Sequence, residues 1–225
     1  MSKLTGPEIL KQMENGHIVI DPFNPDHVNP NSVDLTLGKI LLVYKTYPEW
    51  SNPPDIAYHR STEAALQLDQ LKRKDSETNP CGIEQRPLEL AQWSGVLDMA
   101  ERTACYRLTI PEEGLVLVPG RLYLGSTVEY TETRNFVPCI EGRSSIGRLG
   151  INIHSTAGFG DIGFCGTWTL ELSVVEPVRV YAGVRFAQIH YDTPWGQIKN
   201  YESEKYQGQR TPRASGLWKE FEKNK

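Results

Sequence analysis

The chain has 225 residues, of which 39% are hydrophobic and 23% charged, a composition typical of one folded domain with its own core. Its formal net charge of −4 argues against wrapping around DNA or RNA, although a few local arginines and lysines suffice to hold a triphosphate. The first residues lack the pattern of a signal peptide and no apolar run approaches membrane-spanning length, so we expect a cytoplasmic protein.

The N-terminus is predicted to form a short helix. Thr5 and Glu8 have the spacing of a capping box, Pro7 falls in the first turn, and Gly16 follows the last turn. A strand is expected next at residues 17–20, before a turn rich in proline and asparagine.

Residues 32–44 are predicted to form one or two strands. Apolar and polar side chains alternate at the start of this segment, which predicts that one face is buried and the other exposed. The apolar set is Val33, Leu35 and Leu37, and the polar set is Ser32, Asp34 and Thr36.

Residues 46–104 have a different character, because prolines at positions 48, 53, 54, 80 and 87 interrupt them. The one helix expected there is 61–74, with Ala64, Leu68 and Leu71 on one stripe. A long segment of this kind inside a compact domain is either functional or an elaboration of the fold. The residues alone leave both readings open.

After Cys105 the pattern is that of an all-β protein. Short apolar runs are separated by Gly, Pro, Asn or Asp, which favours a sandwich or jelly roll over a βαβ fold. We therefore expect a single domain over residues 1–225, with a polar C-terminal tail at about 200–225. The runs are LVLVP, LYLGSTVEY, FVPCIEG, INIHSTAG, TWTLELSVV, VRVYAG and VRFAQIHY.

The segment GRSSIGRLG, residues 142–150, suits the binding of phosphate. Its small residues allow close approach of a ligand, and free N–H groups at the start of a helical turn attract anions. Arg143 adds a planar charged fork, and Arg148 shares a helical face with Ser144. The alternative is a capped surface turn whose arginines are solvated.

The next segment, STAGFGDIGFCG at residues 155–166, has the glycines and aspartate of a tight turn. Asp161 either caps that turn or accepts a hydrogen bond from a sugar hydroxyl or a water. Phe164 either belongs to the core or forms a flat wall against a sugar or base. The residues alone leave both choices open.

A strand is expected at residues 167–175, with Trp168, Leu170, Leu172 and Val174 on one face. Glu171 then lies on the other face, beside Thr167, Thr169 and Ser173. In an isolated domain Glu171 is an ordinary exposed side chain. If a second subunit covers this face, Glu171 becomes a partly desolvated carboxylate suited to act as a general base.

The tail contains YESEKYQGQR at residues 201–210, with Tyr201, Lys205 and Gln209. A segment with a lysine, amide donors and a glycine can close over phosphates as a lid. The alternative is a frayed terminus.

Together, GRSSIGRLG, HSTAGFGDIGF, TLEL and KYQGQR resemble the motif series of the dCTP deaminase branch of the dUTPase-like family, in the same order. The resemblance is dense over residues 137–175, recurs at 205–210 and is weaker at NPNSVDLTLG near the N-terminus. Residues 46–104 lie largely outside it and are interpreted as an enlarged insertion. The resemblance implies a mainly β, distorted jelly roll with a few short helices, assembled as a homotrimer with active sites between subunits.

The resemblance also implies hydrolytic deamination of dCTP to dUTP and ammonia without zinc, in the supply of precursors for dTTP. In agreement, the zinc deaminase signature, H-x-E followed by P-C-x-x-C, is absent from the sequence. The four cysteines, Cys81, Cys105, Cys139 and Cys165, are widely spaced and expected to be free thiols, and neither they nor the five histidines cluster as zinc ligands do.

Roles carry over from the family by position. Glu171 is the implied general base, while Ser144, Arg148 and the backbone at Ala157 place the water and stabilise the tetrahedral centre. Asp161 is expected to contact the sugar 3′-hydroxyl and Phe164 to pack on the sugar. The remaining implied substrate contacts, to a triphosphate that carries Mg²⁺, are Arg143, Ser145, Thr156, Gly158, Tyr201, Lys205 and Gln209.

Family members differ in whether the reaction stops at dUTP or continues to dUMP and pyrophosphate. Gly158 resembles the bifunctional type, since single-activity members often carry His there. Gly160 departs from the family turn, which has an apolar residue at that position, and we expect it to loosen the turn. His154 is either an ordinary strand histidine or part of feedback inhibition by dTTP.

Two other functions remain open at this point. One is a dUTPase without deaminase activity, against which the glutamate of TLEL stands. The other is a non-catalytic module that binds dCTP or dTTP as a sensor.

Overall fold

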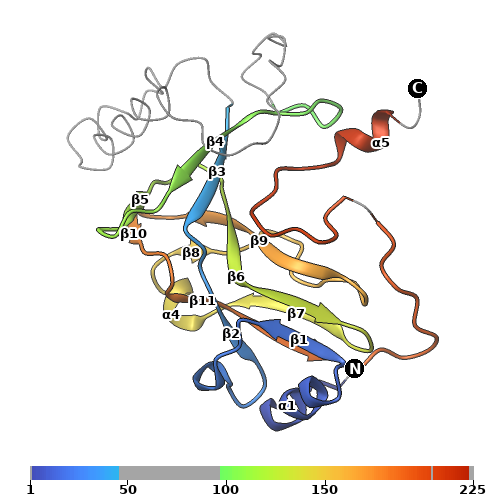
Figure 1. Cartoon of the computed structure of the whole chain (residues 1–225). Coiled ribbons are helices and arrows are strands. Elements are labelled where there is room, and N and C mark those ends of the chain that lie inside the picture. Colours follow the sequence, from blue (N-terminus) through green and yellow to red (C-terminus); the bar gives the residue numbers. More distant parts are fainter. Residues whose placement is uncertain (1, 46–96, 204, 223–225) are drawn as a thin grey trace.

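The computed structural model describes residues 2–45, 97–203 and 205–222, and in that part of the chain the fold is mainly β (Figure 1). The expected helix at 61–74, and all of the predicted insertion up to residue 96, lie outside the described residues. The helical elements are α1 (Gly6–Glu14), the 3-10 turn η1 (Pro25–His27), α4 (Ser144–Gly147) and α5 (Trp218–Glu222). The strands are β1 (Ile18–Asp21), β2 (Val33–Thr36), β3 (Ile40–Tyr44), β4 (Cys105–Thr109), β5 (Leu115–Leu117), β6 (Tyr123–Thr133), β7 (Val137–Gly142), β8 (Ile151–Asn152), β9 (Cys165–Val174), β10 (Val178–Val180) and β11 (Arg185–Asp192).

The described strands pair antiparallel in three sheets. The largest has the order β4-β3-β6-β9-β8, with β1 pairing to the other part of β6. A three-stranded sheet has the order β2-β11-β7, and β5 pairs with β10. The long strands β6 and β9 lie at the centre, and the side chains between the sheets form one core cluster that includes Leu35, Leu170 and Ile189.

The N-terminal helix forms as its capping residues predict. The hydroxyl of Thr5 accepts a hydrogen bond from the backbone N–H of Glu8, at 3.4 Å, and proline occupies the first turn. Gly16 follows the helix with φ of 70°, a left-handed conformation that glycine adopts without steric cost. The following strand runs one residue beyond its predicted end, as β1.

Strand β2 confirms half of its predicted pattern. Val33, Leu35 and Leu37 are buried as expected, but Ser32 and Asp34 are buried too, with only 2% of Asp34 exposed. The simple rule of one exposed face fails because β2 lies inside the structure with polar partners on its second face, as described below.

The predicted strand at 151–158 is much shorter than expected. Only Ile151 and Asn152 form a strand, β8, which pairs with β9. Beyond them the chain turns away, and residues 158–160 instead run beside β7, where Cys139 and Phe159 form an isolated antiparallel bridge. Among the described helices, none is long and apolar enough to cross a membrane.

The tail is ordered against its own chain over most of its length. From residue 200 it follows the turn before β9 and then the start of β9, and it ends in α5 (Figure 1). The backbone N–H of Tyr201 donates to Ile162, at 2.7 Å, and that of Thr167 donates to Gln209, at 2.9 Å. The tail therefore packs on this chain rather than fraying.

Candidate active site

The segment 142–150 forms the predicted helical turn, α4. Ser144, Ser145 and Arg148 are all exposed on it. In a single chain this turn contacts β8, and Val175 donates its backbone N–H to Gly150, at 3.0 Å. The turn thus lies next to the C-terminal end of β9, with its polar side chains directed to solvent.

Arg143, which precedes α4, does not point freely into solvent. Its Nε lies 3.1 Å from Oδ1 of Asp34, and its Nη1 donates to the backbone carbonyl of Arg185, also at 3.1 Å. Asp34 receives a further hydrogen bond from the Asn29 amide, at 2.9 Å. Sequence reasoning assigned Arg143 to the site but missed Asp34, which holds it. Asp34 could have been noticed in the sequence, because it is the one charged residue of the NPNSVDLTLG segment that resembles the family.

Glu171 lies on β9 as predicted, half-buried, with Trp168, Leu170, Leu172 and Val174 buried on the opposite face. Its Oε2 accepts a hydrogen bond from the backbone N–H of Ser155, at 3.2 Å. The backbone of Glu171 also bonds to that segment, because its N–H donates to Ile153, at 2.8 Å. The carboxylate is therefore oriented by the segment that follows β8 and precedes Thr156 and Ala157.

Thr167 is buried although it belongs to the polar face of β9, with only 3% of it exposed. The tail covers it: the Gln209 amide donates to the Thr167 carbonyl, at 2.6 Å, and to the Thr169 hydroxyl, at 3.3 Å. Gln209 is itself 4% exposed. In this chain Gln209 anchors the tail, because its amide donates two hydrogen bonds to β9. Its assignment as a contact to the triphosphate stays a prediction.

The turn that carries Gly158 and Gly160 is tied to β7 by two short backbone bonds. Ile140 donates to Gly158, at 2.6 Å, and Gly160 donates to Pro138, at 2.7 Å. A Cβ on Gly158 would lie 2.9 Å from the ring of His154. His154 approaches Glu141 at 3.8 Å, and its Nδ1 is buried with no hydrogen-bond partner among the described residues.

Gly160 is not a loose point in the turn, contrary to our expectation. A Cβ there would lie 2.5 Å from Cη2 of Trp168, so the indole occupies the space that an apolar side chain would take. The indole is fixed in turn, because its Nε1 donates to the Thr131 hydroxyl, at 2.9 Å. The missing side chain at 160 is compensated by a large one at 168.

The rings of Phe164 and Tyr201, both predicted site residues, pack against each other. Their ring centroids lie 6.1 Å apart, and Phe164 also packs on Trp168, at 5.4 Å. Asp161, three residues earlier, is exposed, and its carboxylate makes no hydrogen bond or ion pair within the described part of the chain. An aromatic wall and an exposed carboxylate thus share one turn.

Lys205 is engaged within the tail. Its ammonium binds the carboxylate of Glu220 in α5, and this hydrogen bond raises the pKa of Lys205 above its usual value. Arg213 adds a hydrogen bond to the carbonyl of Lys205, at 2.9 Å. Binding of a phosphate by Lys205 therefore requires exchange of the Glu220 contact.

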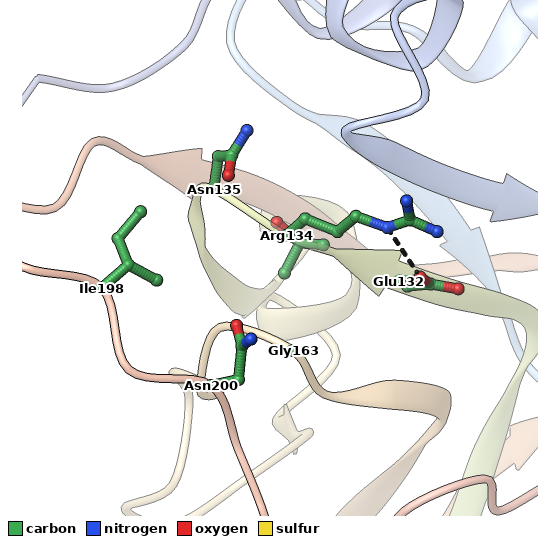
Figure 2. A pocket seen from close by; sticks show the side chains of 7 residues that line it. Glu132, Arg134, Asn135, Gly163, Ile198 and Asn200 are labelled. Carbon is green, nitrogen blue, oxygen red and sulfur yellow. Dashed lines mark hydrogen bonds and ion pairs between the residues drawn. The ribbon is translucent and has the colours of Figure 1, made fainter.

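An open hollow lies to one side of these groups (Figure 2). It has a volume of about 470 Å³ and lies between the β6–β7 hairpin and the start of the tail. Arg134 lies across it, with its Nε 3.1 Å from Glu132. The pocket holds none of the predicted site residues, although Gly163 and Asn200 adjoin Phe164 and Tyr201. Among the described residues, the predicted site thus lies outside this hollow.

One group among the described residues has the composition of a metal site, Cys139, His190 and Asp192. The ammonium of Lys3 lies on it, 2.5 Å from Nδ1 of His190 and 3.4 Å from Asp192. Burial and this positive charge lower the pKa of His190, and burial raises the pKa of Cys139. The side chain of Lys3 already supplies the cation that this group binds.

Comparison with known proteins gives consistent results. A model of the dCTP deaminase-like family matches residues 3–78 and 86–193. Over 98% of its length the chain is 43% identical to a protein of Leptospira biflexa and 42% identical to one of Cytophaga hutchinsonii, each named "dCTP deaminase, dUMP-forming". It covers 98% and 99% of those two proteins. A protein of Clostridium acetobutylicum with the same name is 42% identical over 97% of the chain.

The fold likewise resembles that of a solved 2′-deoxycytidine 5′-triphosphate deaminase from Agrobacterium tumefaciens, with a TM-score of 0.50 and 19% identity. That match covers 85% of this chain and about half, 48%, of the other. The family match also includes 46–78 and 86–104, most of the segment that the motif series left outside the resemblance. The resemblance drawn from the four motifs is confirmed over the full length: the chain belongs to the dCTP deaminase-like family.

Proposed function

We propose that this protein hydrolyses dCTP to dUMP, releasing ammonia and pyrophosphate, through dUTP. The observation that carries the proposal is the carboxylate of Glu171, held by the backbone N–H of Ser155 at the edge of β9. The names of the relatives, at 42–43% identity over nearly the whole chain, support the same reaction and its end point.

In the first step we assign Glu171 as the base that takes a proton from water. The oxygen attacks C4 of cytosine, and the C4–N bond breaks after the proton is delivered to the amino group, which leaves as ammonia. Ser144, Arg148 and the backbone at Ala157 hold the water and the developing charge. We assign water activation to this carboxylate rather than to zinc, since the sequence lacks the zinc deaminase signature.

In the second step water attacks the α-phosphorus of dUTP and the bond to the bridging oxygen breaks, giving dUMP and pyrophosphate. The exposed Asp161 suits this step, because its carboxylate shares a turn with the Phe164–Tyr201 wall and can orient water beside the sugar. Arg143 and Ser145 hold the phosphates at one end of the site. Lys205 joins them once Glu220 releases it.

A magnesium ion carried by the triphosphate would neutralise part of the charge on the phosphates. The residues around α4 fit this arrangement, because they are hydroxyls and arginines rather than a carboxylate cage. The metal-like group at Cys139, His190 and Asp192 is of a different kind and already holds Lys3.

We further propose a homotrimer with its sites between subunits. In one chain α4 lies on the side of β8, whereas the tail with Tyr201 and Lys205 follows the other end of β9 (Figure 1). Residues assigned to one substrate are thus distributed over two ends of the chain. Neighbouring subunits would bring complementary ends together and cover Glu171.

The direct test is to incubate the protein with dCTP and Mg²⁺ and to measure dUTP, dUMP, ammonia and pyrophosphate over time. The proposal predicts equal amounts of ammonia, dUMP and pyrophosphate. Accumulation of dUTP would limit the function to deamination. Turnover of dUTP alone would replace it with a dUTPase, and no turnover of either nucleotide would contradict the proposal.

A further inference from the structure

We infer that Arg185 is a second phosphate-binding residue, paired with Arg143 across the buried carboxylate of Asp34. This inference deepens the proposed function and rests on it for the identity of the ligand, a triphosphate. Neither Arg185 nor Asp34 stood out in the sequence as part of the site.

The first support is the charge arrangement. Asp34 is 2% exposed and carries one negative charge, while the guanidinium groups of Arg143 and Arg185 approach its two oxygens at 3.1 and 3.4 Å. Within this group of three side chains, one carboxylate therefore faces two guanidinium groups, and the group carries a net charge of +1. The side chains of Arg143 and Arg185 are 27% and 47% exposed, so this charge faces solvent.

The second support is the backbone that aims Arg185. Gln188 of β11 pairs with Asp34 of β2, and paired residues direct their side chains to the same face. Alternation alone would place Arg185, three residues away, on the opposite face. The pairing shifts by one residue between Arg185 and Ala187, and such a bulge redirects the side chain. This irregularity brings Arg185 to Asp34.

The third support is a polar network that fixes the same place on the sheet. The hydroxyl of Ser32 donates to Oε1 of Gln188, at 3.0 Å, and the Gln188 amide donates to the carbonyl of Gly142, at 3.2 Å. Gly142 immediately precedes Arg143, so β2, β11 and β7 together set where the arginine begins. Asp34 is accordingly a positioning residue.

The fourth support is the unused hydrogen-bonding capacity. The contacts above engage Nε and Nη1 of Arg143 and Nη1 of Arg185, and no described residue bonds to Nη2 of either. Two guanidinium edges next to the exposed hydroxyls of Ser144 and Ser145 suit a polyphosphate, which arginine binds in a bidentate manner.

The test measures binding of inorganic tripolyphosphate by calorimetry, at fixed ionic strength, to the full chain and to variants. Arg185→Ala is expected to weaken binding about tenfold or more, the size of a lost charge-assisted hydrogen bond, and Arg185→Lys to recover part of the loss. Arg107→Ala, which removes an exposed arginine from β4, should have no effect. Binding by Arg185→Ala within twofold of the unaltered chain would overturn the inference.

Steady-state kinetics with dCTP distinguishes a loss of phosphate binding in the Arg185 variants from a general distortion of the site. Arg185→Ala should raise KM about tenfold with kcat within twofold, and deoxycytidine, which has no phosphates, should inhibit it as well as before. A matching loss of deoxycytidine binding would show that Arg185 is merely structural. Asp34→Asn should weaken tripolyphosphate at least as much as Arg185→Ala, since both arginines lose their anchor. If that variant does not fold, the two Arg185 variants decide alone.

The failures of this inference and of the proposed function are distinguishable. Tripolyphosphate binding that depends on Arg185, without turnover of dCTP, would support the anion site and contradict the deaminase. Turnover of dCTP with an unchanged KM in Arg185→Ala would support the deaminase and contradict the anion site at Arg185.

Discussion

Glu171 takes its orientation from the backbone rather than from another side chain. A carboxylate that accepts one N–H bond, from Ser155, keeps lone pairs on its other oxygen for water. The bond also ties the carboxylate proposed as the base to the segment that contains Thr156 and Ala157, whose backbone is proposed to hold the water.

Replacing Glu171 with Gln tests this role. The amide has nearly the same shape but cannot take a proton, so ammonia release from dCTP should fall about 10²–10⁴-fold, the usual contribution of a general base. Binding of dCTP, measured by calorimetry, should persist. Ser173→Ala, on the same face of the same strand, is the matched control and should remain active. Ammonia release by Glu171→Gln at the original rate would remove Glu171 from the mechanism.

Gly160 provides a second prediction at this scale. A Cβ there would overlap the Trp168 indole, so Gly160→Ile should destabilise the fold by about 1–3 kcal/mol, as overpacking does. The pair Gly160→Ile with Trp168→Ile should recover much of that loss, because the second change returns the volume. Denaturant unfolding of the two single variants and the double variant measures the coupling. If the changes in the free energy of unfolding of the two single variants simply add in the double variant, the two side chains do not share one volume.

The sequence predicted which face of β9 each side chain occupies better than the contacts made there. Trp168 and Glu171 lie on opposite faces of β9, as the alternation of apolar and polar residues along the strand predicted. The burial of Thr167 and Asp34 was not predicted, since it depends on Gln209 and on two arginines that are distant in sequence. Alternation describes only one strand, and these partners come from other elements.

Among the elements, the tail has the least predictable role. Its composition allowed either a lid or a frayed end, and the structure shows a segment bound along β9. The aromatic hydroxyls of Tyr206 and Tyr44 accept backbone N–H bonds from Gly216 and Ser215, each at 2.9 Å, so the tail is attached at several points. Such contacts between distant segments leave no local pattern in a sequence.

Gln209→Ala should loosen this attachment. The variant loses the amide bonds to β9, each worth about 1 kcal/mol, and should be cleaved faster by trypsin at Lys205, Arg210 and Arg213. The measurement is the rate of tail cleavage under native conditions, followed by mass spectrometry. Gln197→Ala, at an exposed position, is the control. Unchanged cleavage would show that the amide does not hold the tail.

At the scale of the whole molecule, two of the proposed parts of the site lie apart in the described structure: α4 and the tail contact opposite ends of β9. Strand lengths and turns predicted a mainly β domain, which the structure confirms. How copies of the chain associate decides which surfaces form a shared site. The periodicity of apolar residues in one sequence does not predict that association.

Mixing variants tests a site shared between subunits. Glu171→Gln and Arg148→Ala should each be nearly inactive alone. If these residues serve one site from different chains, unfolding and refolding the two together should restore part of the activity through sites that carry neither change. Activity in the mixture no higher than the sum of the separate proteins would show that each chain supplies both groups.

The exchange between Gly160 and Trp168 also has an evolutionary consequence. Two positions that share one volume constrain each other's history, so substitutions at them should occur together during divergence. Relatives with a branched apolar residue at the first position should carry a side chain smaller than tryptophan at the second. A lineage that acquires only one of the two changes would pass through a less stable intermediate, so the pair can mark a subgroup within the family.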